Sequence, residues 1–245
     1  MGDFIDLHTH AMFGFDDGAA SGEETLEMLR LAGQAGFGTV LATPHVMVGV
    51  YEHDREVLEE AIAGLAPDLA ALPSPVRLLP GAEYYLDEHF AEIFEQGEAC
   101  RLGSGNHVLV ELPMLRIPPL AREFAFRLRI KGLVPVLAHP ERYADVAKKP
   151  ERAVELREAG YLIQLNLGSL AGMYGRGPRK AAEWLLKKDQ VDLLASDAHT
   201  PKQAEQAYGE GLAALRKAVG EEGVQRLLVA NPGTVLSAET MNNEK

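Results

Sequence analysis

The 245-residue chain lacks several features that whole classes of protein need. Its single cysteine, Cys100, excludes an intrachain disulfide framework and is typical of a reducing compartment. No apolar run approaches the 18 or so residues of a membrane span, and the first residues lack the charged-then-apolar pattern of a signal segment. We therefore expect a cytoplasmic protein with no membrane insertion.

Basic side chains are also scarce. The chain has 24 lysines and arginines against 36 acidic residues, a formal net charge of −12 and a pI of about 5.1. So acidic a surface repels phosphate backbones, and we expect no nucleic-acid partner. The thiol-based phosphatase loop is missing as well, because Asn106 stands six residues after Cys100, where that loop needs an arginine. A buried structural cysteine is the better interpretation of Cys100.

Seven short apolar runs recur along the chain, and they are continuous rather than alternating. They are FIDLH from Phe4, TVLAT from Thr39, VRLLPGAEYY from Val76, HVLVEL from His107, VPVLAH from Val134, LIQLNL from Leu162 and VDLLAS from Val191. Continuous runs are typical of parallel strands that are buried on both faces. Helical patterns separate the runs, which predicts one α/β domain, a TIM-like (β/α)7 barrel over residues 1–238, with a polar tail at 239–245. An open doubly wound sheet is the alternative, but no glycine-rich phosphate loop follows any run.

The first predicted helix has the clearest boundaries. Ser21 and Glu24 have the spacing of a capping box, and Gly36 ends the apolar pattern that follows. Further helical patterns run over about residues 54–72, 120–131, 151–159, 179–188 and 202–219. The glycines between Asn166 and Arg179 predict a mobile loop.

Histidines and acidic residues gather where the predicted strands end. Five of the eight histidines and four carboxylates lie at or just after the ends of six of the runs: His8, His10, Asp17, His45, Glu83, Glu111, His139, Asp197 and His199. The carboxyl ends of the strands in a (β/α) barrel form one rim, so these side chains should converge. A buried histidine taken singly is usually structural, but nine such donors at successive strand ends are not explained in that way. Clustered carboxylates need positive charge nearby, which metal ions supply.

The type of donor narrows the choice of metal. Nine imidazole and carboxylate groups exceed the three or four that one zinc ion needs, so we expect two or three divalent ions, with Glu83 and Asp197 as bridges. Donor sets of nitrogen and oxygen without thiolate suit Mn²⁺, Fe²⁺ or Zn²⁺. Arg142, three residues after His139, is placed to form a forked pair of hydrogen bonds with a phosphate, or else a surface salt bridge.

These strings together resemble a known family. IDLHTHAMFGFDDGA, ATPH, PGAEYY, VLVELP, AHPERY, QLNLGSLAGMYG and ASDAH are similar to the PHP (polymerase and histidinol phosphatase) superfamily. Within it, they most resemble the bacterial metal-dependent protein-tyrosine phosphatases of capsule and exopolysaccharide synthesis. The resemblance covers about residues 4–232 and implies a distorted seven-stranded barrel with a trinuclear, often Mn²⁺-dependent, centre. It implies that the nine donors are ligands and that Arg142 binds the substrate phosphate.

The resemblance also implies a substrate and a mechanism. The substrate would be phosphotyrosine on a partner protein, typically a bacterial tyrosine kinase that governs polysaccharide export. A metal-bridging hydroxide would attack phosphorus in line, and Asp197 or His199 would assist proton transfer. Tyr84 and Tyr85 either stack on the aromatic substrate or are ordinary half-buried strand residues.

Three alternatives stay open at this point. A histidinol-phosphatase-like enzyme for small phosphomonoesters would keep every ligand and change only the pocket. An amidohydrolase would share the HxH string and the barrel, although its bridging group is often a carbamylated lysine, and none of the first five runs ends in lysine. A scaffold that binds a kinase without turnover should have lost ligands, whereas this sequence keeps the full set.

Overall fold

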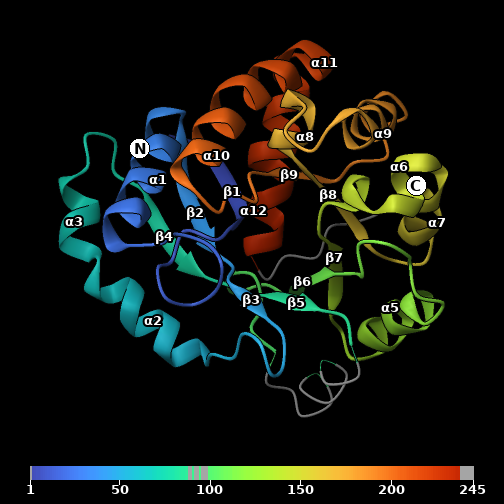
Figure 1. Cartoon of the computed structure of the whole chain (residues 1–245), viewed down its shortest axis with the longest axis horizontal. Coiled ribbons are helices and arrows are strands. Elements are labelled where there is room, and N and C mark those ends of the chain that lie inside the picture. Colours follow the sequence, from blue (N-terminus) through green and yellow to red (C-terminus); the bar gives the residue numbers. More distant parts are fainter. Residues whose placement is uncertain (1, 88–89, 91–93, 95–98, 238–245) are drawn as a thin grey trace.

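A computed structural model describes residues 2–87, 90, 94 and 99–237 of the chain, so the predicted tail at 239–245 lies outside the described residues (Figure 1). Every strand pair in this part of the chain is parallel. The strands are β1 (Phe4–Thr9), β2 (Phe37–Ala42), β3 (His45–Val46), β4 (Arg77–Pro80), β5 (Glu83–Tyr85), β6 (His107–Glu111), β7 (Val134–Leu137), β8 (Leu162–Asn166) and β9 (Leu193–Ala195).

These strands form a curled, nearly closed barrel. One set has the order β1-β2-β4, and the other has the order β3-β5-β6-β7-β8-β9. The two ends of the arrangement meet where β1 lies beside β9, since the Asp197 amide donates to the His8 carbonyl at 2.8 Å and the His10 amide to the Ala198 carbonyl at 3.0 Å. The predicted TIM-like α/β fold is confirmed, in a distorted form.

Two of the predicted strands are interrupted. Thr43 and Pro44 separate β2 from β3, and Gly81 and Ala82 separate β4 from β5. The two interrupted segments stay adjacent, because the Gly81 amide donates to the Ala42 carbonyl at 2.8 Å. Pro44 has no amide hydrogen to continue a ladder, and a Cβ at position 81 would come within 2.9 Å of the Thr43 methyl group. Counting each interrupted pair as one strand gives the seven predicted positions within the described residues.

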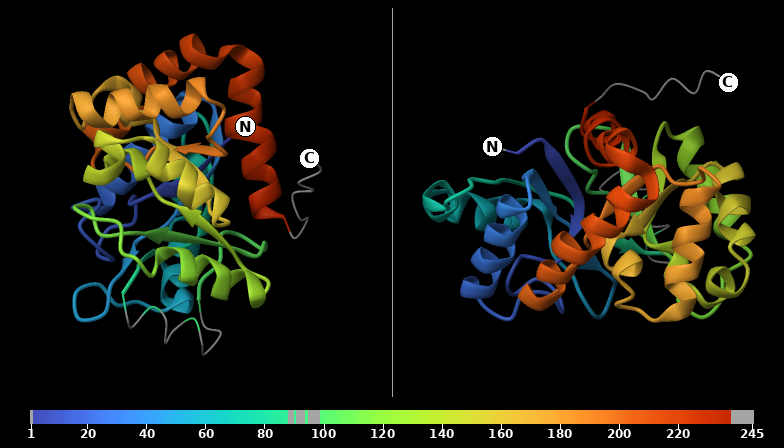
Figure 2. Two further views of the ribbon diagram at one scale, coloured as in Figure 1. Left: turned by 90° about the vertical axis from the view of Figure 1, so that its right-hand side faces the viewer. Right: turned by 90° about the horizontal axis from the view of Figure 1, so that it is seen from above.

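Helices surround the barrel, as the two further views in Figure 2 show. The α-helices are α1 (Gly22–Gln34), α2 (Arg55–Gly64), α3 (Ala66–Ala71), α5 (Ala121–Ile130), α6 (Ala144–Lys148), α7 (Glu151–Glu158), α8 (Leu167–Ala171), α9 (Arg176–Lys187), α10 (Pro201–Gln206), α11 (Leu212–Gln225) and α12 (Asn231–Leu236). A 3₁₀ turn covers Pro140–Arg142, and π-helical segments cover Ala207–Gly211 and Arg226–Ala230.

Several helix predictions need correction. The single helix predicted over residues 54–72 is divided at Leu65, directly before the segment that contains Pro67. The predicted loop from Asn166 to Arg179 contains α8 and the start of α9, and two of its glycines mark helix ends instead. Gly172 ends α8 with φ of 85°, and Gly175 precedes α9 with φ of 90°.

The barrel interior has an apolar base below a polar rim. Leu7, Leu109, Leu162 and Leu193 belong to an inner apolar cluster, to which α12 contributes Val235. Side chains two residues apart on a strand share a face, so Gln164 lies on the same face as Leu162, one step nearer the strand end. Each strand thus changes from apolar packing to polar groups toward its carboxyl end, which places the candidate site at the rim.

Candidate metal centre

The nine predicted donors are all brought together at the rim. Their ligand atoms fall into three groups, within each of which the atoms lie no more than 4.8 Å apart. The groups are His10, Asp17, His45 and His199; His8, Glu83, His139 and Asp197; and His45, Glu83 and Glu111. His45 occurs in the first and third groups, and Glu83 occurs in the second and third. The three groups therefore form one continuous centre.

Glu83 lies at the middle of this centre. Its Oε2 atom is 3.2 Å from His8 Nε2, 3.3 Å from His10 Nε2 and 3.0 Å from His45 Nδ1. Its other oxygen lies 3.1 Å from His139 Nε2. Among the described residues Oε2 nevertheless makes no well-aligned hydrogen bond. An oxygen that faces three nitrogens in this way has the surroundings of a bridging metal ligand.

Asp197 has similar surroundings in the centre. Its Oδ1 atom lies 3.3 Å from both His8 Nε2 and His10 Nε2 and 3.7 Å from His199 Nδ1. This oxygen too is buried without a hydrogen bond from the described residues. The Oδ2 atom is engaged instead, since it accepts from Asn166 Nδ2 at 2.6 Å and Arg142 Nη1 at 2.5 Å.

The histidine tautomers indicate that a cation belongs between these groups. His8 Nδ1 lies 2.8 Å from Gln164 Oε1, and His10 Nδ1 lies 2.6 Å from Asp16 Oδ2. Both acceptors require a hydrogen on Nδ1, which leaves a lone pair on each Nε2. The two Nε2 atoms face each other at 3.0 Å. Two lone pairs at that separation repel unless a proton or a metal ion lies beside them, so the residues fit a metal centre.

The pKa values describe the same balance of charge. Burial lowers the pKa of His8, but Glu83 and Asp197 outweigh burial and raise it to about 9. Burial raises the pKa of Asp197, but the surrounding histidines, His8 first, hold it well below the usual range. Burial and the Glu83 charge raise the pKa of Glu111 to about 8. The buried carboxylates therefore depend on cationic partners, a need that divalent ions meet.

The centre has a buried interior and a more open edge. His8, His10, Glu83 and His139 are almost fully buried, whereas the His45 side chain is 15% exposed and the Asp17 side chain 56% exposed. Asp17 Oδ1 lies 3.7 Å from His45 Nε2 and 3.6 Å from His199 Nε2. The group made by Asp17, His45 and His199 is accordingly the one nearest to solvent.

Unusual backbone angles aim two of the donors. His139 has φ of 32° and Asp197 has φ of 51°, both in the left-handed region. His139 lies two residues after the end of β7 and Asp197 two residues after the end of β9, and the left-handed turn changes the direction of the chain at that point. Histidine and aspartate enter this region more readily than most residues with a side chain, and such strain is concentrated at functional sites.

Arg142 lies beside the centre at the end of the 3₁₀ turn. Its guanidinium carbon is 4.3 Å from the centre of the Tyr174 ring, and its side chain is 23% exposed. The ring of Tyr174 and the carboxylate of Asp197 together fix this cation at the rim. An arginine in this position can present two N–H groups to an anion.

One important residue was missed by the sequence-based prediction. Asp16, not only Asp17, belongs to the centre: its Oδ2 accepts from His10 Nδ1 and also from the His45 amide at 2.9 Å. Burial raises the pKa of Asp16, but the hydrogen bond and charge of His10 outweigh burial, and the pKa is lowered to about 2. Histidine ligands commonly donate their second nitrogen to a carboxylate, so the signal was the neighbouring Asp16-Asp17 pair. Sequence alone does not tell which of two adjacent aspartates faces inward.

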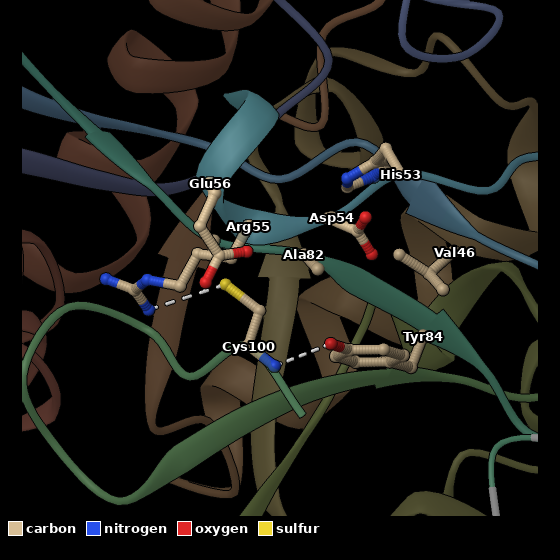
Figure 3. A pocket seen from close by; sticks show the side chains of 9 residues that line it. Val46, His53, Asp54, Arg55, Glu56, Ala82, Tyr84 and Cys100 are labelled. Atoms are coloured by element: carbon tan, nitrogen blue, oxygen red, sulfur yellow. Dashed lines mark hydrogen bonds between the residues drawn. The ribbon is translucent and has the colours of Figure 1, made fainter. Parts of the chain in front are cut away.

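Tyr84 lies outside the centre, which corrects one of its two interpretations. Val46, Ala82 and Tyr84 are sequence neighbours of the rim donors His45 and Glu83, so along the strands their side chains face the opposite side. They line a separate cavity of about 480 Å³ (Figure 3). There the Cys100 amide donates to the Tyr84 hydroxyl at 2.6 Å. Cys100 is buried, as expected of a structural cysteine, and burial raises its pKa. Such a thiol is a poor nucleophile at neutral pH.

Within the described residues, none of the helices combines the length and apolar character needed to cross a membrane.

Similar proteins share almost the full length of this chain. YwqE of Bacillus subtilis, a tyrosine-protein phosphatase, is 31% identical over 237 residues, which cover 97% of this chain and 93% of YwqE. CpsB of Streptococcus pneumoniae, also a tyrosine-protein phosphatase, is 27% identical over 241 residues, which cover 95% of this chain and 98% of CpsB.

Solved structures agree with these relatives. A crystal structure superposes on this chain with a TM-score of 0.88. It comes from work on YwqE of Bacillus subtilis and CpsB of Streptococcus pneumoniae, which are described there as unique metal-dependent tyrosine phosphatases. It is 31% identical, and the match covers 97% of this chain and 96% of that one. Histidinol phosphate phosphatase of Lactococcus lactis shares only the fold, with a TM-score of 0.59, 15% identity and coverage of 89% and 94%.

The family comparison agrees with the full-length relatives. Residues 4–237 match the family described as capsular polysaccharide synthesis, CpsB/CapC. That match spans every donor of the rim, from His8 to His199, and it confirms the predicted resemblance to bacterial tyrosine phosphatases of capsule synthesis. With nearly the whole length matched and a relative at 31% identity, the chain belongs to the CpsB/CapC family.

Proposed function

We propose that this chain is a metal-dependent phosphatase that hydrolyses phosphotyrosine on a protein. Full-length similarity to tyrosine-protein phosphatases supports the reaction and the substrate class. The observation that carries the metal dependence is the pair of facing Nε2 atoms of His8 and His10, 3.0 Å apart, between the unpaired oxygens of Glu83 and Asp197.

Two or three divalent ions would occupy the centre. Three donor groups support the higher number. Glu83 belongs to two of these groups, and Asp197 Oδ1 lies within 3.7 Å of His8, His10 and His199, so each of these two carboxylates would help to hold more than one ion. The proposed ligands are the nine donors His8, His10, Asp17, His45, Glu83, Glu111, His139, Asp197 and His199. Donors of nitrogen and oxygen without sulfur suit Mn²⁺, our first choice, as well as Fe²⁺ and Zn²⁺. When bound, such ions act as Lewis acids that activate water and offset the charge of the phosphate.

The protein's own side chains would orient the phosphate and manage protons. Arg142, held by Tyr174, would bind two phosphate oxygens through its forked N–H groups. Water would attack phosphorus in line, so that a new O–P bond forms while the P–O bond to the tyrosine ring breaks. The leaving phenolate takes up a proton, for which Asp197 and His199 are the candidate carriers. A phenol has a pKa of about 10, so this leaving group needs little help from an acid.

The family assignment also suggests the partner. The proposed substrate is the phosphorylated segment of a bacterial tyrosine kinase of capsule or exopolysaccharide synthesis. A cytoplasmic location, proposed from the single cysteine, would place the phosphatase with such a kinase segment.

Phosphate release by the purified full chain tests this proposal. The chain would be stripped with a chelator, reloaded with Mn²⁺, and assayed on a phosphotyrosine peptide and on histidinol phosphate. His139→Ala removes one proposed ligand, and His107→Gln is a matched control, because His107 is equally buried but lies outside the donor groups.

We expect activity that depends on the added ion. His139→Ala should lower this activity by at least about 100-fold, and His107→Gln should retain it. A preference for the peptide supports the tyrosine-phosphatase assignment. A preference for histidinol phosphate would replace it by a small-molecule phosphatase, and activity that survives chelation would overturn the role of the metal.

A further inference from the structure

The segment between β3 and α2 presents an aromatic ring beside the metal centre. Residues 47–51 form a tight loop in which the Met47 amide donates to the Tyr51 carbonyl at 2.9 Å and the Tyr51 amide to the Met47 carbonyl at 2.8 Å. Gly49 at the tip has φ of 77°, and its amide donates to Glu52 Oε1 at 2.6 Å. The loop is therefore internally bonded, and backbone hydrogen bonds define the position of Tyr51.

Tyr51 lies against the most open part of the donor set. Its ring stacks on the His45 ring, with centroids 5.9 Å apart and planes at 19°. Burial raises the pKa of Tyr51, and the nearby charges of Asp17 and Asp16 raise it further. The ring thus borders the edge formed by Asp17 and His45, which is where a substrate coming from solvent would reach the centre.

Two further contacts connect this edge to the loop after β1. The Phe15 and His53 rings meet edge to face with centroids 5.4 Å apart, and Asp16 accepts from the His45 amide. The loop after β1 and the loop after β3 therefore support each other. On the second loop, Val50 is 60% exposed and Val48 38% exposed, so an apolar surface continues outward from Tyr51.

We propose that Tyr51 is a specificity-determining residue that packs against the phenyl ring of an aryl phosphate while its phosphate lies at the metal centre. The inference rests on the proposed function and deepens it. In phosphotyrosine the aromatic ring is attached directly to the phosphate oxygen, so the ring must lie next to the donor set. Offset or edge-to-face contact between two aromatic rings is favourable beyond the burial of area alone. An alkyl phosphate such as phosphoserine has no ring to place there.

The test compares an aryl with an alkyl phosphate. The Mn²⁺-loaded full chain, Tyr51→Leu and Tyr51→Phe would be assayed on two peptides that differ only in phosphotyrosine against phosphoserine. We expect Tyr51→Leu to lower the aryl-to-alkyl ratio of kcat/KM by about 3- to 10-fold, the range set by one aromatic contact. Tyr51→Phe should keep the ratio. Phe126→Leu, which removes an exposed ring from α5 far along the chain, is the matched control.

A binding measurement separates recognition from turnover. In calorimetry on the Mn²⁺-loaded protein, benzylphosphonate should lose affinity in Tyr51→Leu by a similar factor, while methylphosphonate should not. An active Tyr51→Leu variant with an unchanged ratio and unchanged benzylphosphonate affinity would overturn this inference and leave the proposed function standing. No hydrolysis of either peptide by the unchanged chain would overturn the proposed function and, with it, the role of Tyr51.

Discussion

At the scale of single residues, Asp16 holds two parts of the candidate centre in place. One carboxylate oxygen accepts from the His10 ring and the His45 amide, and the other accepts from the Gly18 amide at 2.9 Å. A carboxylate in this position fixes the orientation of the imidazole and increases its basicity.

Asp16→Asn should therefore weaken metal binding. An amide that presents its oxygen to the ring keeps the geometry but loses the charge that makes His10 a stronger ligand. We expect the affinity for Mn²⁺, measured by calorimetry on the stripped full chain, to fall by about 10- to 100-fold. Asp3→Asn, an exposed aspartate remote from the rim, controls for the change in net charge. Equal affinities for the two variants would contradict the role given to Asp16.

His107 is a buried histidine of a different kind. It begins β6, is 2% exposed, and its Nδ1 has no hydrogen-bond partner among the described residues. Burial lowers its pKa to about 4, against an ordinary value of 6.5, more than a backbone contact with Val235 raises it. The folded protein therefore holds this ring neutral at a pH where the unfolded chain would protonate it.

Acid should destabilise the fold through His107. Between about pH 6.5 and pH 4 the His107 ring binds a proton in the unfolded state but stays neutral in the folded state. The free energy of unfolding is therefore unaffected by this group above pH 6.5 and decreases as the pH falls toward 4. The loss is on the order of 3 kcal/mol. His107→Gln removes this titration, so the difference in free energy of unfolding between the parent and the variant should shrink over that window. Urea denaturation of both proteins at several pH values measures it, and a constant difference would refute the prediction.

At the scale of elements, the sequence was most informative where local chemistry decides the structure. Ser21 begins α1 as predicted, and its Oγ accepts from the Glu24 amide at 3.3 Å while Glu24 accepts from the Ala20 amide at 3.0 Å. The interruption at Pro44 was not predicted, because an apolar run reads the same whether its two halves pair in one ladder or two. The helices between Asn166 and Arg179 were missed because glycines at helix ends look like glycines in a loop.

The cap of α1 permits a direct test. Ser21→Ala removes the acceptor for the Glu24 amide and should lower the free energy of unfolding by about 1 kcal/mol, measured by urea denaturation. Ser21→Asp keeps an oxygen at that position and should restore stability to within a few tenths of a kcal/mol. If the aspartate variant were as unstable as the alanine variant, the side-chain cap would not be the cause.

The same distinction applies to the candidate site. The nine donors could be predicted because each lies at or after the carboxyl end of a predicted apolar run, and parallel strands bring their carboxyl ends together whatever the details of packing. Asp16 and the contact of Arg142 with Tyr174 depend on how loops turn after the strands end. Loop direction is set by contacts distant in sequence, which no local pattern contains.

At the scale of the whole molecule, a buried carboxylate joins the first strand to the last. Asp6 on β1 accepts from the Ser196 amide at 3.1 Å and from the Tyr208 hydroxyl at 2.8 Å. Burial raises the pKa of Asp6. The hydrogen bonds that Asp6 accepts, those from Ser196 first, lower its pKa in part. The bond to the Ser196 amide joins residues 190 positions apart, and this network helps to keep the barrel closed beneath the candidate metal centre.

Tyr208→Phe should open this network measurably. It leaves a buried acidic acceptor with one donor fewer and should cost about 1.5–3 kcal/mol of unfolding free energy, as expected for a hydrogen bond to a charged group. Tyr161→Phe is the matched comparison, because the Tyr161 hydroxyl is also buried but donates to the neutral Ala121 carbonyl at 2.8 Å. That change should cost about 0.5–1.5 kcal/mol. A smaller loss for Tyr208→Phe than for Tyr161→Phe would contradict the account of Asp6.

The closure of β1 against β9 also sets an order of events during synthesis. A ribosome releases His8 and His10 first, yet the groups that face them, Asp197 and His199, emerge some 190 residues later. His8 and His10 therefore lack Asp197 and His199 as neighbours while most of the polypeptide is still being synthesised. The proposed metal centre could therefore form only after Asp197 and His199 have been synthesised, and a product terminated before these residues would lack it.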